Sequence, residues 1–243
     1  MFVSVHNLKT NMGVDESIAR FFVDRKVPAD NAFWRKRFLY IGRGNGYISI
    51  PVYYDLLMKL GLPREELLEE SHVQFMEKLM HFAILVEYKE MDFRQHLEEI
   101  SNLLLPRLKN RAFYEELLAY LRQPVLHPKG RLGMPVPSLN RADVFLFILC
   151  DLRMTDEQVD KAIGYWYALH TSYLLMDDIY DYKLDKQDQE ENAVIDLGDS
   201  EIGFGKAFGL LRRNIETMKQ INPQLADHFE ESMAGLADID PKL

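Results

Sequence analysis

Four aspartates in the C-terminal third of the chain have the spacing of a cation-binding cluster. Asp177, Asp178, Asp181 and Asp185 directly follow an apolar stretch that ends at Met176. In a helix, residues 177, 181 and 185 fall at i, i+4 and i+8, so their carboxylates share one face. Like charges at this spacing destabilise a helix by roughly 0.2–0.5 kcal/mol per pair, and a nearby helix C-terminus adds a similar penalty. A hard divalent cation such as Mg²⁺ would relieve both, so the cluster predicts a metal site.

The same acids also fit a solvated helix end, where acidic residues are common. Residues upstream on the same helix, among them Ile163, Tyr167 and Leu169, have the pattern of a buried face. The acids therefore follow directly from core sequence, which favours a position at the mouth of a cavity. Carboxylates removed from water need a positive partner, either a metal ion or basic side chains.

The motif helix is predicted over about residues 156–186, and Thr155 to Gln158 form a capping-box sequence at its start. Elsewhere, apolar residues recur every three to four positions and no strand-like alternation stands out, so we expect an all-α fold. Gly42, Gly44 and Gly46 mark a loop. Other helices are predicted over 15–25, 51–60, 63–91, 107–122, 140–151, 202–221 and 224–237.

We expect one all-α domain over residues 1–243, a single large helical bundle. Residues 124–137 contain four prolines and two glycines and form a proline-rich loop. This loop separates an N-terminal helical region, 1–123, from the motif-bearing region, 138–243.

Composition excludes several classes of protein. The net charge is −9 and no dense basic stripe occurs, which argues against binding to nucleic acid. Cys150 is the one cysteine, so no disulfide can form within the chain, as expected in a reducing cytoplasm. The first residues lack the apolar stretch of a signal peptide, and no apolar run approaches the ~20 residues of a membrane span. We therefore predict a soluble, cytoplasmic protein without a membrane span.

The motif HTxxLLxDDxxD, which starts at His170, resembles the first aspartate-rich motif of the trans-isoprenyl diphosphate synthases. These enzymes belong to the class I isoprenoid (terpenoid) synthase fold. Upstream, the stretch KGRLGMP at 129–135 is similar to the basic GKRxRP loop of that family. The resemblance covers about residues 128–198, and it implies a helical bundle of the isoprenoid synthase type.

This resemblance implies Mg²⁺-dependent chemistry on an allylic prenyl diphosphate, by chain elongation or cyclisation after ionisation of the diphosphate. In the family, aspartates hold Mg²⁺ ions that grip the diphosphate, and basic residues complete the clamp. A homodimer is a further expectation, because dimers are common in the family. Carried over by position, the metal ligands would be Asp177, Asp178 and Asp181 with Asp185 as a fourth acid, and the diphosphate contacts Lys129 and Arg131.

The chain departs from the family pattern because it has no second DDxxD motif. The motif could instead correspond to the second one of the family, which continues to an acid and a DL pair, here Asp185 and Asp196-Leu197. The N-terminal half would then supply the first site, with the acids of 87–92 as its best candidates. The family's arginine pair is also missing after the motif, and Arg212-Arg213 could substitute or be a solvated basic pair.

Two other functions remain open. The missing second motif fits a non-catalytic relative of the fold that binds a prenyl compound or a partner protein. Glu66-x-x-Glu69 and Glu87-x-x-Glu90 resemble the acidic motifs of all-α nucleotide pyrophosphohydrolases. Glu69-x-x-His72 matches half of a di-iron carboxylate signature, whose second half is absent.

Overall fold

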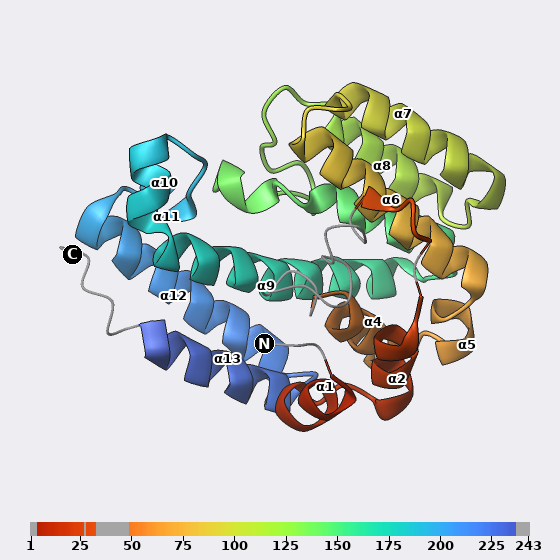
Figure 1. Cartoon of the computed structure of the whole chain (residues 1–243), viewed down its shortest axis with the longest axis horizontal. Coiled ribbons are helices and arrows are strands. Elements are labelled where there is room, and N and C mark those ends of the chain that lie inside the picture. Colours follow the sequence, from red (N-terminus) through yellow and green to blue (C-terminus); the bar gives the residue numbers. More distant parts are fainter. Residues whose placement is uncertain (1–3, 27, 33–48, 237–243) are drawn as a thin grey trace.

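The computed structural model describes residues 4–26, 28–32 and 49–236, and these residues form helices joined by short connections (Figure 1). No strand occurs within these ranges, where Lys129 and Leu132 form only an isolated bridge. The expected all-α fold is confirmed. The helices are α1 (Val5–Met12), α2 (Glu16–Asp24), α4 (Ser49–Lys59), α5 (Arg64–Leu67), α6 (Glu70–Glu87), α7 (Phe93–Leu104), α8 (Arg111–Leu121), α9 (Asp156–Tyr180), α10 (Tyr182–Asp188), α11 (Ala193–Asp196), α12 (Ser200–Lys219) and α13 (Pro223–Leu236), with 3-10 helices η2 (Leu105–Arg107), η3 (Pro137–Asn140) and η4 (Asp143–Asp151).

Helix α9 crosses the middle of the molecule, and α4, α12 and α13 pack against it (Figure 1). The predicted capping box is present: the Gln158 amide N–H donates to Thr155 Oγ1 at 3.2 Å, and the Thr155 N–H donates to Gln158 Oε1 at 3.0 Å. These bonds satisfy amide groups that the first helical turn leaves without a partner. Most of the helix is then buried in the core. This packing determines where the aspartates at its C-terminal end lie.

Polar and steric features hold α12 against α9 and α11. Asn214 Nδ2 donates to Thr171 Oγ1 at 2.8 Å and to Ser172 Oγ at 3.1 Å. At the other end of α12, a Cβ on Gly203 would lie 2.1 Å from the carbonyl oxygen of Val194. Only glycine permits so close an approach of the two backbones.

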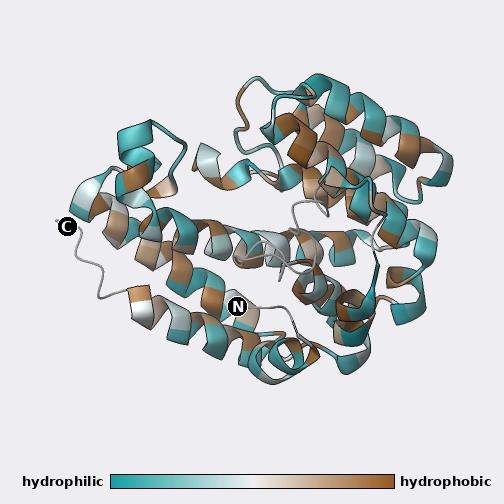
Figure 2. Ribbon diagram, viewed as in Figure 1, coloured by the Kyte–Doolittle hydropathy of each residue, from teal (hydrophilic) through white to brown (hydrophobic). Residues whose placement is uncertain are grey.

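Helix η4 lies between α6 and α8, and every residue from Asp143 to Asp151 is buried. A helix that is apolar on all sides belongs in a core, and η4 is one. The sequence predicted an α-helix over 140–151, whereas the structure has two 3-10 helices, η3 and η4. The outer helices have one hydrophilic and one hydrophobic face (Figure 2); on α7 the buried side comprises His96, Leu97, Ile100 and Leu104.

The single helix predicted over 63–91 is wrong, because α5 and α6 are separated at Leu68 and Glu69. Glu69 has φ −60° and ψ 131°, which is extended backbone. A continuous helix would set glutamates one turn apart, Glu65 beside Glu69 for example, and like charges at that spacing are destabilising. After the break, Arg25 pairs with Glu70 at 2.9 Å and with the buried Glu77 at 2.5 Å.

Two further expectations from the sequence concern the glycine loop and membrane spans. The loop predicted at Gly42, Gly44 and Gly46 lies outside the described residues. Within the described part of the chain, no helix combines the length and apolar character that crossing a membrane requires.

Candidate functional site at the acidic end of α9

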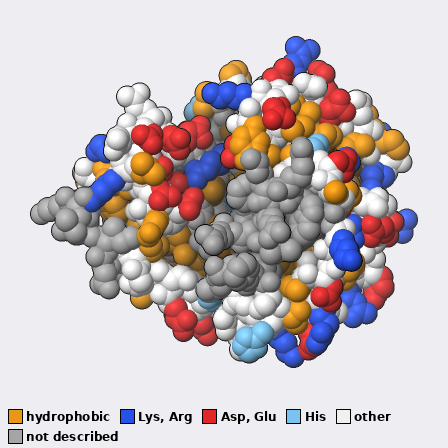
Figure 3. Space-filling model, viewed as in Figure 1, with side chains coloured by type: hydrophobic (Ala, Val, Ile, Leu, Met, Phe, Trp, Pro, Cys, Tyr) orange, Lys and Arg blue, Asp and Glu red, His pale blue; other side chains and the backbone are white. Residues whose placement is uncertain are grey.

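The four aspartates lie around the junction between α9 and α10. Asp177 and Asp178 occupy the last turn of α9, Asp181 joins the two helices, and Asp185 lies one turn into α10. The motif helix predicted over 156–186 therefore ends early, at Tyr180. The helical turn nevertheless continues, because the Asp181 N–H donates to the Asp177 carbonyl at 2.8 Å and the Asp185 N–H donates to the Asp181 carbonyl at 3.0 Å. Acidic side chains gather at this end of the molecule, with basic ones beside them (Figure 3).

Asp178 is buried, and both of its carboxylate oxygens have protein partners. Oδ1 accepts a hydrogen bond from Arg141 Nη2 at 2.8 Å, and Oδ2 accepts one from the backbone N–H of Ala193 at 2.8 Å. Asp178 thus joins the end of α9 to the residue after η3 and to the start of α11. A metal ion could reach this carboxylate only if Arg141 moved away.

Asn192 fixes the segment that follows α10. Its Nδ2 donates to the Asp178 carbonyl at 2.7 Å and to Asp185 Oδ2 at 2.8 Å, while its Oδ1 caps α11 by accepting from the Val194 N–H. Asp196 Oδ2 accepts from the Ser138 N–H at 3.2 Å. Asp185 and Asp196, which the resemblance matched to the second family motif, therefore accept hydrogen bonds from Asn192 and from Ser138 of η3, respectively.

Asp177 and Asp181 are different, because in the described part of the chain neither carboxylate has a hydrogen bond or an ion pair. Asp177 is exposed, but the protein around it partly displaces its hydration and raises its pKa, and the charges of Asp181 and Asp178 raise the pKa further, against the opposing effect of Arg141. Partial burial and the charges of Asp185 and Asp178 raise the pKa of Asp181. Both carboxylates would therefore gain from a nearby cation.

The donor set fits one mode of Mg²⁺ binding and not another. Within the described ranges, no three His, Cys, Asp or Glu side chains are arranged as a metal site. Metal binding by Asp177, Asp178, Asp181 and Asp185 therefore stays a prediction. Mg²⁺ usually keeps several waters and is held by one or two carboxylates together with the phosphates of a ligand. Asp177 and Asp181 have carboxylates without a partner in the described residues, and two such carboxylates are compatible with that mode.

Arg141 is the residue of this site that the sequence did not reveal. Its Nη1 donates to the Ser138 carbonyl at 2.9 Å and its Nη2 to Asp178, yet 30% of the side chain is exposed. Its positive charge favours ionised Asp177 and disfavours protonated His170. The guanidinium therefore lies beside Asp178 and close to Asp177. It stands 37 residues before Asp178 in the chain, and no local spacing points to it.

An aromatic stripe on α9 leads to Asp177. Trp166, His170 and Tyr173 lie at i, i+4 and i+7, and the rings of Trp166 and His170 stack with centroids 4.5 Å apart. Both ring nitrogens of His170 and the Tyr173 hydroxyl are buried and have no hydrogen-bond partner among the described residues. Burial lowers the pKa of His170 to about 3, so this imidazole is neutral at pH 7. The stripe is therefore mostly apolar, although the ring nitrogens of His170 and the hydroxyl of Tyr173 could still form hydrogen bonds.

The structure does not bring Lys129 and Arg131 to the aspartates. Arg131 pairs with Glu116 at 2.9 Å and with Asp160 at 2.5 Å. Asp160 precedes Asp177 by 17 residues on one continuous helix, which at 1.5 Å per residue separates them by about 25 Å. Lys129 Nζ donates to the Ala119 carbonyl at 3.3 Å. The basic loop therefore packs at the opposite end of α9.

Arg212 and Arg213 are exposed on α12. Arg213 lines a groove between α12 and residues 134–136, and no interaction joins either arginine to the four aspartates. The arginine pair is thus separate from the acidic end of α9.

The acidic pairs in the N-terminal half do not form a site together. Helix α6, about 27 Å long, separates Glu66 and Glu69 from Glu87 and Glu90. A pyrophosphohydrolase needs such pairs on facing helices, so the structure offers that function no support. His72 is fully buried, and its Nδ1 lies 3.0 Å from Asp151 Oδ2 rather than beside Glu69.

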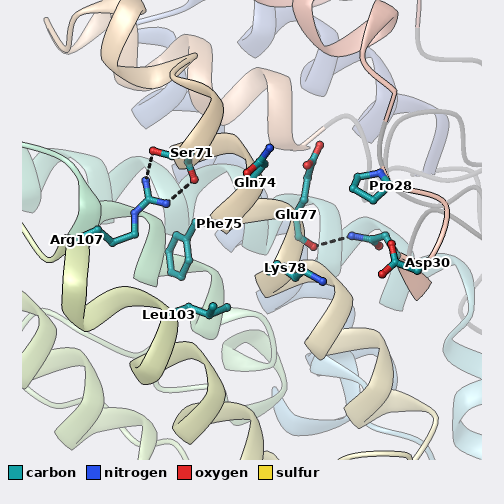
Figure 4. Close-up of a pocket in the computed structure, with 10 residues that line it drawn as sticks. Pro28, Asp30, Ser71, Gln74, Phe75, Glu77, Lys78, Leu103 and Arg107 are labelled. Atoms are coloured by element: carbon teal, nitrogen blue, oxygen red, sulfur yellow. Dashed lines mark hydrogen bonds between the residues drawn. The ribbon is translucent and has the colours of Figure 1, made fainter.

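A cavity of about 390 Å³ borders α6, and two pairs of its polar residues are hydrogen-bonded to each other (Figure 4). Arg107 donates to Ser71 Oγ at 3.0 Å and to the Ser71 carbonyl at 2.5 Å. Asn31 Nδ2 donates to the Glu77 carbonyl at 2.9 Å. Phe75 and Leu103 supply apolar surface. Asp30 and Lys78 also line the cavity and have no ion pair within the described residues, but their charges are of opposite sign, unlike the cluster of acids at the end of α9.

No family model matches the chain, and neither a curated protein nor a solved structure matches it. The isoprenoid synthase type, the Mg²⁺ requirement and the homodimer therefore stay predictions. Function has to be inferred from the residues around Asp177 and Arg141.

Proposed function

We propose that the acidic end of α9 binds the diphosphate of an allylic prenyl diphosphate together with Mg²⁺, and that the protein is an isoprenoid synthase-like enzyme. One observation carries this proposal. Asp177 and Asp181 have raised pKa values and no partner in the described chain, while Arg141 beside them carries a partly exposed positive charge. Carboxylates for a metal and a guanidinium for phosphate oxygens are the two halves of a metal–diphosphate site.

Different residues of the site would bind the metal ion, contact the phosphate and position the arginine. Asp177 and Asp181 would hold Mg²⁺, and when bound the ion neutralises charge that develops on a departing diphosphate. Arg141 would contact a phosphate oxygen, because a planar guanidinium matches phosphate geometry. Asp178 acts as a positioning residue, since it holds Arg141 in place at 2.8 Å.

The aromatic stripe that leads to Asp177 is part of the packed core. Trp166 is 2% exposed and stacks on both Phe145 and His170, with ring centroids 5.0 and 4.5 Å away, and Tyr173 packs against Phe229. The proposal therefore rests on Asp177, Asp181 and Arg141 and not on an open apolar cavity. Chain elongation and cyclisation both begin with ionisation of the allylic diphosphate, the step that these charged groups would assist.

Release of pyrophosphate from C5–C20 prenyl diphosphates tests the proposal. We expect release from at least one of these substrates with Mg²⁺ and none with EDTA. Asp177→Asn should lower the rate at least tenfold, whereas Asp188→Asn, at an exposed position near the end of α10, should leave it unchanged. Equal rates in both variants, or release without a divalent ion, would contradict the proposal.

The closed state of Asp178 favours one alternative, a non-catalytic relative of the fold. Arg141 and the Ala193 N–H already occupy this carboxylate, which leaves fewer acids for a metal than the family uses. Such a protein would bind a prenyl compound or a partner protein without turnover. Product formation from any C5–C20 prenyl diphosphate would exclude it.

A further inference from the structure

A groove of about 570 Å³ lies along one flank of α12, apart from the acidic end of α9. Its walls are apolar and come from Met134, Val136, Leu197 and Leu210. The volume lies within the range of pockets that enclose small ligands, roughly 300–1,000 Å³. Residues 134–136 and Leu197 approach α12 from two separate connections, so the groove has walls on both sides.

Two glycines give the groove its depth. Gly205 and Gly209 lie one turn apart on α12 and both line the groove. A Cβ on Gly205 would meet no atom within 4 Å, and one on Gly209 would meet only Arg213 Nη1, at 3.8 Å. The space above these glycines is therefore open. A larger side chain there would fill the groove without a backbone clash.

The charges that line the groove are all positive. Lys206 and Arg213 lie seven residues apart, which places them on the same side of α12, and both line the groove. Lys206 Nζ donates to the Leu197 carbonyl at 2.7 Å. Arg213 has no acidic partner in the described chain, and no described acidic side chain lines the groove. In a protein with a net charge of −9, this is a local reversal of sign.

We propose that this groove binds a free single-chain anionic amphiphile, an alkyl or isoprenoid chain with a phosphate head group. The chain would lie over Gly205 and Gly209 between the apolar walls, and the phosphate would contact Arg213. Because no described carboxylate lines the groove, this binding needs no Mg²⁺. It is independent of Asp177 and of the function proposed for the end of α9.

Calorimetric titration with dodecyl phosphate, below its micelle concentration and in EDTA, tests this inference. We expect binding to the wild type that weakens at least tenfold in Gly209→Leu and in Arg213→Gln. Gly164→Leu is the matched control, because a Cβ on Gly164, an exposed position of α9, also meets nothing within 4 Å. That variant, like Asp177→Asn, should bind as the wild type does.

Three further probes separate the alternatives. Dodecyl maltoside, which has a neutral head group, and inorganic phosphate alone should each bind at least tenfold more weakly than dodecyl phosphate. Equal binding of the maltoside, or an undiminished affinity in Gly209→Leu, would overturn the proposal. Binding to vesicles of phosphatidylcholine and phosphatidylglycerol without binding of monomeric dodecyl phosphate would also overturn it, in favour of a membrane surface. Thermal unfolding of each variant verifies that it is folded.

Discussion

At the scale of single residues, neighbouring aspartates have opposite roles. Asp178 is 2% exposed and fully bonded, and its charge is balanced by Arg141 at 2.8 Å. Asp177 has no partner in the described chain, and partial loss of hydration together with the charges of Asp181 and Asp178 raises its pKa. One position of difference in the chain thus separates a carboxylate bonded within the protein from one that is free to bind a ligand.

This difference predicts opposite effects on stability. Asp178→Asn should lower the free energy of unfolding by about 2–4 kcal/mol, because it leaves the partly buried Arg141 without a counter-charge. Asp177→Asn should change it by no more than about 0.5 kcal/mol and in the stabilising direction, because it removes a like-charge contact with Asp181. Urea denaturation of both variants measures this. Similar losses in the two would show that Asp177 is also structural.

Asp143 makes a second residue-scale prediction, about pH. Its Oδ2 accepts hydrogen bonds from Tyr120 at 2.7 Å and Tyr167 at 2.9 Å, and its Oδ1 accepts one from Trp166 at 3.2 Å. Burial outweighs these bonds and raises the pKa of Asp143 to about 6. The folded state therefore holds this proton more tightly than the unfolded state, whose carboxyl has a pKa of about 3.9.

Because the pKa of Asp143 is higher in the folded state than in the unfolded state, acidification favours folding. As pH falls from 7.5 to 5, protonation of Asp143 should stabilise the wild type, with a full effect on the order of 3 kcal/mol once pH is below both pKa values. Asp143→Asn lacks this titrating group and does not gain this stability. On acidification, the unfolding free energy of the wild type should therefore increase relative to that of the variant. Urea denaturation at pH 7.5 and pH 5 measures the shift. A constant difference would mean that Asp143 titrates normally.

At the scale of elements, close packing of α12 on α11 depends on Gly203. Gly203→Ala would set a Cβ 2.1 Å from the Val194 carbonyl oxygen, so the helices must separate, and we expect a loss of about 2 kcal/mol or more. Gly205→Ala, two residues away with open space around it, should gain about 0.5–1 kcal/mol from helix propensity. Thermal unfolding of the pair distinguishes packing from propensity. A loss in both would point to a requirement for flexibility instead.

The sequence predicted elements well where local signals were strong. The capping box at Thr155 was predicted and marks the start of α9, because the bonds that cap a helix involve residues only a few positions apart. The helix predicted from residue 15 corresponds to α2, whose N-cap is Asp15. The break before α6 was missed because Glu69 is a favourable helix residue by propensity alone. At this position, repulsion between glutamates and the ion pair between Glu70 and Arg25, 45 residues away, favour extended backbone over helix.

At the scale of the whole molecule, periodicity was enough to predict an all-α fold, since each helix must bury one face. It could not assign the basic loop to an end of α9. Arg131 lies beside Asp160 rather than Asp177, and only tertiary packing decides between them. Periodicity could not predict the role of Arg141 for the same reason, because its partner Asp178 lies in another element, α9. The order of motifs along a chain does not fix their distances in space.

Calorimetric titration of inorganic pyrophosphate into the protein, with and without Mg²⁺, tests most directly whether the end of α9 binds a diphosphate. We expect binding that requires Mg²⁺, is lost in Asp177→Asn, is weakened in Asp181→Asn, and persists in Asp188→Asn. No Mg²⁺-dependent binding in the wild type, or unchanged binding in Asp177→Asn, would contradict the claim that the end of α9 is a diphosphate site.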